Sequence, residues 1–98
     1  MEQHDQTVST TAALIVQRIF AHFHHHINVR YRILIVNDPF NACYNWFLEW
    51  QRSGHRTRSV PLHSMGNNQQ FLVEVIRQVR RQVGMSIVYR GFNKKIST

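Results

Sequence analysis

The sequence is poor in cysteine, proline and acidic residues. Its 98 residues include one Cys, two Pro and five Asp or Glu. The lone Cys43 has no partner for an internal disulfide, which is typical of proteins kept in a reducing, intracellular setting. Catalysis by paired carboxylates needs two acids in one pocket, and only Asp38, Glu49 and Glu74 follow the first five residues. These shortages argue against a disulfide-rich secreted domain and against an enzyme.

Long apolar runs and nucleotide-binding glycine motifs are also missing. The longest apolar runs, such as residues 12–16 and 33–36, are far shorter than the roughly 20 residues that a membrane helix needs. The first ten residues lack the basic and apolar regions of a secretory signal. The four glycines form neither GxGxxG nor GxxxxGKS/T. We therefore expect an intracellular protein, cytoplasmic or in the nucleus or nucleoid, that binds no membrane, needs no cofactor and is no enzyme.

What is present suffices for one folded domain. The chain is 43% hydrophobic, with six Phe, three Tyr and two Trp, so its composition is not that of a disordered protein. Its length fits a single domain. Residues 1–9 are polar, and we expect them to form a flexible leader before a single α/β domain over residues 10–98.

Hydrophobic spacing predicts a helix followed by a strand. Ser9 or Thr10 is a suitable N-cap. Apolar residues then recur every three or four positions from Ala12 to Ile27, which indicates a helix with one apolar face. Residues 29–36 alternate at first and are then continuously apolar, which predicts a central strand covered on both faces.

A second helix is predicted over residues 39–54. Asp38 can accept N–H bonds as an N-cap, and Pro39 suits the first helical position, which needs no donor. The apolar residues that follow at the spacing of one helix face are Cys43, Trp46, Phe47 and Trp50. Gly54 is a suitable C-terminal stop. On this face Cys43 is expected to be a buried, inert thiol.

The remaining residues predict a strand, a helix and a further strand. Residues 56–62 favour an edge strand, because Pro61 cannot donate to a ladder. The residues after this strand predict a helix that begins at residues 66–68 and a strand over residues 85–89. Residues 91–98 are expected to form a short strand or a tail. The fold expected is a small two-layer α/β sandwich, an N-terminal helix followed by β-α-β-α-β(β), with a largely parallel sheet.

Histidines near the end of the first helix raise the question of a metal. His22 and His26 lie four residues apart and are weak candidate ligands, since this spacing on a helix can chelate an ion. A closed zinc site needs two more ligands, which the fold would have to bring from His4, His55 or His63. The alternative is that these side chains interact with the helix dipole and the last carbonyls. We favour that alternative and expect no bound metal.

The basic residues carry the strongest functional signal. From Arg18 to the end, twelve Lys and Arg face three acids, a net charge of +9, and ten of the twelve are Arg. The planar guanidinium suits bidentate phosphate contacts and stacking on bases. The groups are Arg30 with Arg32, Arg52 with Arg56 and Arg58, Arg77 with Arg80 and Arg81, and Arg90 with Lys94 and Lys95. The alternative is that these basic residues form a solvated face and that those at the end of the last helix compensate the helix dipole.

Two further features bear on how these groups would act. In a parallel sheet the groups around Arg58 and Arg90 would approach one another. The aromatic residues Tyr31, Tyr89 and Phe92 lie among the basic residues and are candidates to stack on unpaired bases.

Four motifs follow one another between residues 31 and 89. They are Val36-Asn37-Asp38-Pro39, a predicted helix ending at Ser53-Gly54-His55, the turn Leu62-His63-Ser64-Met65-Gly66, and a helix ending Val79-Arg80-Arg81. This order resembles the Alba family, small basic nucleic-acid-binding proteins of archaea and eukaryotes that include subunits of ribonuclease P-type particles. The resemblance implies the β-α-β-α-β-β fold shared with the C-terminal domain of translation initiation factor three, dimerisation, and binding of RNA or DNA.

These features predict a small basic module that binds nucleic acid, with RNA slightly favoured over DNA. The expected contact residues are Arg30, Arg32, Arg56, Arg58, Asn67, Asn68, Arg90, Lys94 and Lys95. Asn67 and Asn68 are included because backbone amides at a helix N-terminus can hold a phosphate. The alternative is a protein-interaction, assembly or inhibitor module whose basic face binds an acidic protein, which the aromatic segment around Trp46 and Trp50 favours. We expect a homo- or heterodimer.

Overall fold

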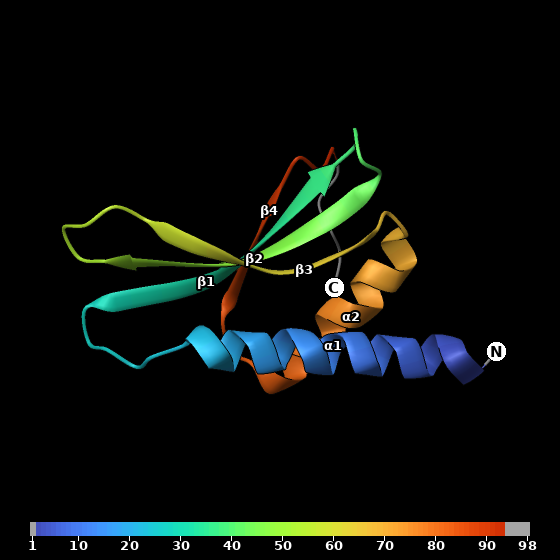
Figure 1. Cartoon of the computed structure of the whole chain (residues 1–98), viewed down its shortest axis with the longest axis horizontal. Helices are drawn as coiled ribbons and strands as arrows, with labels where there is room; N and C mark the ends of the chain where they lie inside the picture. The colour runs from blue at the N-terminus through green and yellow to red at the C-terminus, as the bar shows by residue number, and fades with distance from the viewer. Residues whose placement is uncertain (1, 94–98) are drawn as a thin grey trace.

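Two helices and four strands make up residues 2–93, the part of the chain that the computed structural model describes (Figure 1). They follow in the order α1 (Glu2–His22), β1 (Val29–Asp38), β2 (Cys43–Arg52), β3 (Arg58–Gly66), α2 (Gln69–Gln82) and β4 (Ser86–Arg90). The prediction of a small α/β domain is confirmed. The predicted order α-β-α-β-α-β is wrong at one element, because the chain is α-β-β-β-α-β.

The four strands form one sheet in the order β3-β2-β1-β4. β1 and β2 are antiparallel, β2 and β3 are antiparallel with an irregularity between Trp46 and Phe47, and β4 is parallel to β1. The sheet is therefore mostly antiparallel, and the prediction of a largely parallel sheet is wrong. β1 lies inside the sheet and β3, which contains Pro61, lies at its edge, as the sequence predicted.

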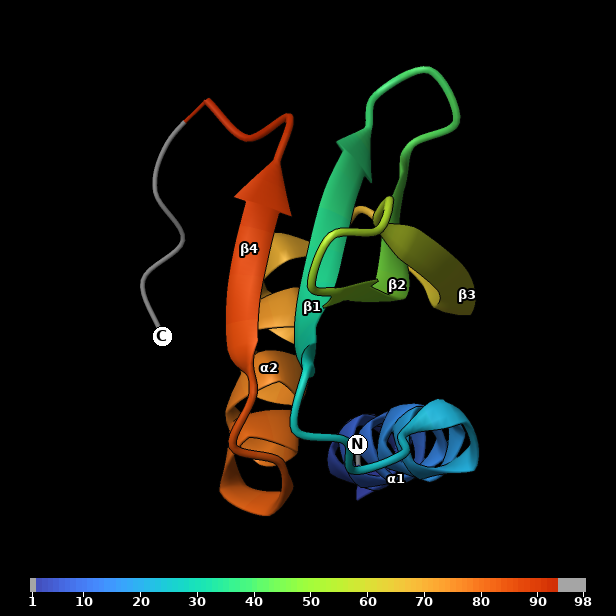
Figure 2. The same ribbon diagram turned by 90° about the vertical axis from the view of Figure 1, so that its left-hand side faces the viewer.

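Both helices lie on one side of the sheet (Figures 1 and 2). α1 and α2 pack against each other, and α1 also contacts β3. The fully buried side chains between the layers include Ile15, Ile19, Ile33, Ile35, Trp46, Leu48, Leu62, Leu72, Ile76 and Val79. No helix of residues 2–93 covers the other face of the sheet (Figure 2), but the burial of β1 follows the prediction: it alternates at first and is nearly complete at Ile33, Leu34 and Ile35. This helix-free face and the ends of the strands are available to a ligand.

Residues 39–54, predicted to be a helix, form a turn and the strand β2 instead. The same segment has a second pattern with period two, in which Tyr44, Trp46 and Leu48 are buried and alternate with Asn45 and Phe47. Large aromatic residues fit the pleated surface of a sheet. Cys43 accordingly begins a strand and is half-buried, rather than lying on the buried face of a helix.

Asp38 makes the hydrogen bonds of an N-cap, but it makes them within a turn. Its Oδ1 accepts the backbone N–H groups of Phe40 at 3.2 Å and Asn41 at 3.3 Å, and its Oδ2 accepts the Asn41 side-chain amide at 2.7 Å. These hydrogen bonds, that of the Asn41 side chain first, lower the pKa of the Asp38 carboxyl. The chain then passes through Ala42 at φ 51° and reverses into β2.

α1 begins at Glu2, ahead of Ser9 and Thr10, where the sequence predicted its N-cap. Val8 is already buried in the core. The flexibility expected of residues 1–9 stays a prediction, whereas the predicted start of the helix is corrected. α1 ends at His22, earlier than the apolar spacing predicted. Within the described residues no helix has the length and apolar character needed to cross a membrane.

The last helix and strand match the prediction. Asn68 is the N-cap of α2, with its Oδ1 accepting the N–H of Phe71 at 3.1 Å, and β4 falls within one residue of its expected place. Gly91 follows β4 at φ 81°, where a Cβ would lie 2.9 Å from the carbonyl oxygen of Asn37. Only glycine fits there without strain. Most of the predicted last strand or tail falls on residues 94–98, outside the described residues.

Candidate nucleic-acid interface

The hairpin that joins β2 to β3 shapes one end of the sheet. The His55 N–H donates to the Arg52 carbonyl at 2.9 Å, which closes a four-residue turn, and Gly54 within it has φ 81°. A positive φ at the third position is what glycine supplies in a type II turn. The Ser53 N–H donates to the Asn28 carbonyl at 2.9 Å. This bond holds the hairpin against the loop that follows α1.

A hollow of about 670 Å³ lies where this hairpin meets the start of β1 and the loop after α1. We call it the basic hollow, and its lining residues are His24, His26, Val29, Tyr31, Trp50, Arg52, Gly54, His55, Arg56 and Arg58. Its three arginines and three histidines are exposed. The hairpin therefore presents these cationic and imidazole groups to solvent on one surface.

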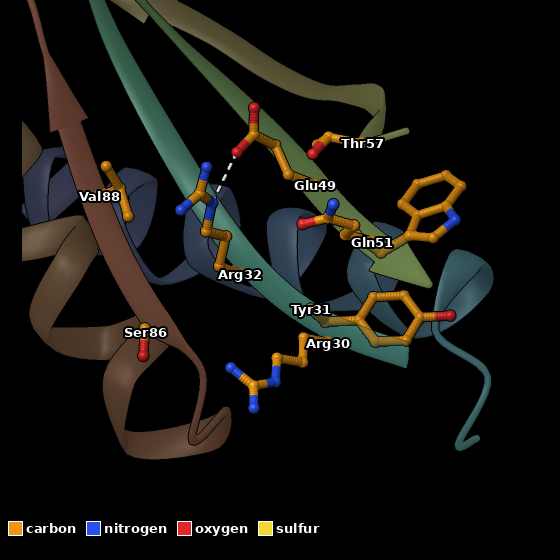
Figure 3. Close-up of a pocket in the computed structure, with 9 residues that line it drawn as sticks. Arg30, Tyr31, Arg32, Glu49, Gln51, Thr57, Ser86 and Val88 are labelled. Atoms are coloured by element: carbon orange, nitrogen blue, oxygen red, sulfur yellow. Dashed lines mark hydrogen bonds and ion pairs between the residues drawn. The ribbon is translucent and has the colours of Figure 1, made fainter. Parts of the chain in front are cut away.

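A second hollow of about 340 Å³ adjoins it on the helix-free face of the sheet (Figure 3). Arg30 and Arg32 project from β1 into this hollow, near Gln51 of β2 and Thr57 of the hairpin. We call it the sheet pocket. It shares Tyr31 and Trp50 with the basic hollow, so the two hollows adjoin as one surface around this end of the sheet, with the Tyr31 ring on the side of β1 opposite to Arg30 and Arg32 (Figure 3).

Five arginines meet on this surface, and Glu49 is the single acid among the residues that line it. Arg32 Nε donates to Glu49 Oε1 at 2.7 Å across the β1–β2 ladder, where the two residues are register partners. About half of the Arg32 side chain, 48%, stays exposed beside the 11% exposed glutamate. The pair partly neutralises Arg32 and leaves a strong positive excess at this end of the sheet.

Tyr31 and Trp50 form an aromatic floor under both hollows. Their rings stack with centroids 5.9 Å apart, and Phe23 meets Tyr31 edge-on at 4.7 Å. The Tyr31 hydroxyl accepts the backbone N–H of His24 at 3.2 Å. Both floor residues are half-buried and pack against the core. Trp50 was not predicted at this surface, because its helical spacing from Cys43 and Trp46 favoured a helix there.

Several predicted contact residues lie at the opposite end of the sheet. Arg90 ends β4 and is the register partner of Val36. Arg58 begins β3, the other edge strand, so the approach expected between the groups around Arg58 and Arg90 does not occur. Asn67 and Asn68 follow the far end of β3, and phosphate binding there stays a prediction. Lys94 and Lys95 lie outside the described residues.

The aromatic residues expected to stack on bases have different surroundings. Tyr89 and Phe92 meet edge-on with centroids 6.0 Å apart, and Phe92 stacks on Tyr44 at 5.5 Å. Both pack against the core, as Tyr31 and Trp50 also do, but neither lines the basic hollow or the sheet pocket. Of the three predicted residues, Tyr31 alone lines the surface. Phe40 was not predicted as a candidate, because residues 39–54 were expected to form a helix, and it is 96% exposed in the β1–β2 turn.

The histidine pair considered for a metal does not lie on one helix. His22 ends α1 and His26 lies in the following loop, so the helical i, i+4 arrangement is absent. His26 instead lines the basic hollow with His24, their rings 6.4 Å apart, and with His55. Over residues 2–93 no three His, Cys, Asp or Glu are grouped so that they could hold a metal ion.

The chemistry of this surface is that of guanidinium and imidazole groups around an aromatic floor. Such a surface suits a polyanion that also carries flat rings. Comparisons of the chain with family models, curated proteins and solved structures found no match. The functional proposal therefore rests on the geometry of the two hollows.

Proposed function

We propose that this protein binds nucleic acid through the basic hollow and the sheet pocket, with RNA slightly favoured over DNA. The observation that carries the proposal is the gathering of five arginines, Arg30, Arg32, Arg52, Arg56 and Arg58, on two adjoining hollows that share Tyr31 and Trp50. Guanidinium groups contact phosphates with paired hydrogen bonds. Tyr31 and Trp50 offer ring faces to a base, and the loops and ends of RNA present such unpaired bases.

The spread of these charges supports a polymer rather than a small anion. The arginines come from β1, from the end of β2 and from the hairpin, rather than converging on one point. Neighbouring strands lie about 4.8 Å apart and residues on one face repeat every ~6.6 Å, so the charges cover the space of several phosphates. A backbone with regularly spaced negative charges matches this arrangement.

Replacement of the hairpin arginines tests the proposal. In the triple variant Arg52→Gln, Arg56→Gln, Arg58→Gln, the slope of log K against log salt should become shallower by about three, roughly one for each lost phosphate contact. Affinity at about 50 mM salt should fall more than tenfold, because each contact also releases counterions. Fluorescence anisotropy with labelled RNA and DNA across a salt series measures both quantities.

The matched control removes the same charge from another surface. Arg77, Arg80 and Arg81 are exposed on α2 and line neither hollow. Their triple replacement by Gln should leave most of the affinity. An equal loss in the two variants would show that net charge alone drives binding and would contradict the proposed interface. Wild-type protein that binds neither RNA nor DNA at about 50 mM salt would refute the function itself.

Membership of the Alba family and dimerisation stay predictions. The turn Leu62-His63-Ser64-Met65-Gly66 does end a strand and lead into a long helix, as the resemblance implies. Residues 39–54, where the resemblance implies a helix, form a turn and a strand. A measurement of molecular mass in solution, with and without RNA, tests the dimer.

A second candidate is an interaction or assembly module for an acidic protein. The observation that favours it is an apolar hollow of about 770 Å³ beside the basic hollow, at which Phe20 and Ile27 are exposed. This hollow shares His26, Val29 and Tyr31 with the basic hollow. An acidic segment with apolar anchors would contact both. Polyglutamate that displaces RNA at equal charge concentration would favour this candidate.

A further inference from the structure

The face of the sheet away from the helices has an apolar centre between arginines. No helix of the described residues covers this face, which we call the open face (Figure 2). At its middle, Leu34 of β1, 4% exposed, lies between its half-buried register partners Phe47 of β2 and Val88 of β4. Arg32 lies two residues before Leu34 on β1, and Arg90 lies two residues after Val88 on β4. The open face thus continues the sheet pocket toward the β1–β2 turn.

Phe40 stands at the far edge of the open face with 96% of its surface exposed. It lines a hollow of about 480 Å³ together with Phe47, Leu34 and Arg90. Its backbone N–H donates to Asp38 Oδ1 at 3.2 Å, so the turn places the ring without packing it. Burial of a Phe side chain is favourable, and a partner that covers this ring gains that contribution.

The charges on the open face select the kind of partner. Arg90 lies beside the two phenylalanines, and Arg30 and Arg32 lie at the other end of the same face. Two acids, Asp38 and Glu49, also line this face, but hydrogen bonds from the turn and from Arg32 engage them. A partner with flat apolar groups between spaced negative charges complements this arrangement.

We infer that the open face binds a single strand of nucleic acid, running from the sheet pocket along β1 to Phe40. This inference rests on the proposed function and names its substrate class. Bases within a duplex are stacked on each other and paired, so Phe40 and Phe47 can stack only on unpaired bases. Val36 lies six positions after Arg30, about 20 Å along the strand. That length accommodates about six nucleotides stacked at ~3.4 Å each.

Anisotropy titrations with single strands and duplexes test the inference. The probes are a single strand of about eight nucleotides that cannot pair with itself, as RNA and as DNA, and the two matching duplexes. Wild-type protein should bind a single strand about tenfold more tightly than its duplex, because only unpaired bases stack on the two rings. Phe40→Ala should weaken single-strand binding about tenfold and leave the salt slope and duplex affinity unchanged, since no charge is lost.

Two further variants isolate the aromatic face of residue 40. Phe40→Trp keeps a stacking surface and should bind the single strand at least as tightly as wild type. Phe20→Ala removes another exposed phenylalanine, 55% exposed on α1, and should bind every probe as wild type does.

The outcomes separate this inference from the proposed function. Equal affinity for single strand and duplex, or a Phe40→Ala variant that binds the single strand as wild type does, would overturn the inference. Salt-dependent binding that involves the hairpin arginines would then still support the proposed function. Absence of binding by wild-type protein at low salt would remove both. A preference for either the RNA or the DNA strand over its duplex supports the inference and identifies the sugar that is bound.

Discussion

His63 lies on β3 next to a positive charge from α1. Arg18 Nη1 donates to the Leu62 carbonyl at 2.5 Å, which places the guanidinium beside His63. Burial first, and the charge of Arg18 second, lower the pKa of His63 below its ordinary value of 6.5. The unfolded chain therefore binds this proton more tightly than the folded protein does. The contribution of neutral His63 to stability is full above about pH 6.5 and is lost as pH falls through its lowered folded pKa.

Acidification should destabilise the wild-type protein more than a His63→Gln variant. The glutamine cannot acquire a charge, so the variant lacks the cost of protonating His63 beside Arg18. Urea unfolding at about pH 7.5 and about pH 5.5 measures the loss of unfolding free energy for each protein. The other histidines are common to both proteins and cancel in the comparison. Equal losses in the two proteins would contradict this prediction.

Asp38 shows what a single residue does and does not determine. Its carboxylate accepts backbone N–H groups, as the sequence predicted for an N-cap. The same hydrogen bonds serve a helix start and a tight turn, because both expose consecutive N–H groups. The local chemistry was therefore predicted correctly and the element that follows it was not. The consequence for the candidate site is large, since the turn is what exposes Phe40.

β2 is the element that the sequence left ambiguous. Trp46 belongs both to a helical set with Cys43 and Trp50 and to an alternating set with Tyr44 and Leu48. In the structure β2 lies between β1 and β3, so its backbone bonds both neighbours and Trp46 is fully buried. Pairing with the preceding and the following strand decides between the patterns, and residues 43–52 alone do not contain that information.

At the start of α2, two adjacent asparagines have different roles. The Asn68 side chain caps the helix by accepting the N–H of Phe71, whereas Asn67 is exposed and its backbone carbonyl accepts the Tyr44 hydroxyl at 3.5 Å. Asn68→Ala should lower the free energy of unfolding by about 1 kcal/mol. Asn67→Ala, the matched control, should change it by less than about 0.5 kcal/mol. Chemical denaturation checks both values, and similar losses in the two variants would contradict the assigned cap.

At the scale of the whole molecule, the fold sorts the basic residues into separate surfaces. Arg30, Arg32 and the hairpin arginines lie around one end of the sheet, and Arg90 lies on the open face at the other end. The arginines of α2 line neither hollow. The sequence predicted that these groups exist and contact phosphates, but not which of them share a surface. That depends on strand order, which places β3 and β4 at opposite edges.

The two tryptophans should respond differently when RNA binds. Trp46 is fully buried between the layers, whereas Trp50 is half-buried in the floor of both hollows. A Trp46→Phe variant should keep the change in tryptophan emission on titration with RNA, because Trp50 remains. A Trp50→Phe variant should lose most of that change while anisotropy still shows binding. A full change in emission without Trp50 would place the bound RNA elsewhere.

The sequence by itself determined the features that depend on neighbours along the chain. These are the positive excess after Arg18, the strand β1, the amphipathic helix α2 with its opening at residues 66–68, and the strand β4. Each arises from propensity, capping or hydrophobic period within a short window. The sequence also showed five arginines in two groups along the chain, but it did not predict that these groups lie at the same end of the sheet.

Only the tertiary structure decided that residues 43–52 pair as a strand, that no described helix covers one face of β1, and that the arginines of β1 and the hairpin line two hollows that adjoin at Tyr31 and Trp50. It also decided that Phe40 stands exposed at the edge of that face. The physical reason is that strand pairing and side-chain convergence are contacts between distant residues. Their free energies outweigh the small local preferences from which a sequence pattern is inferred.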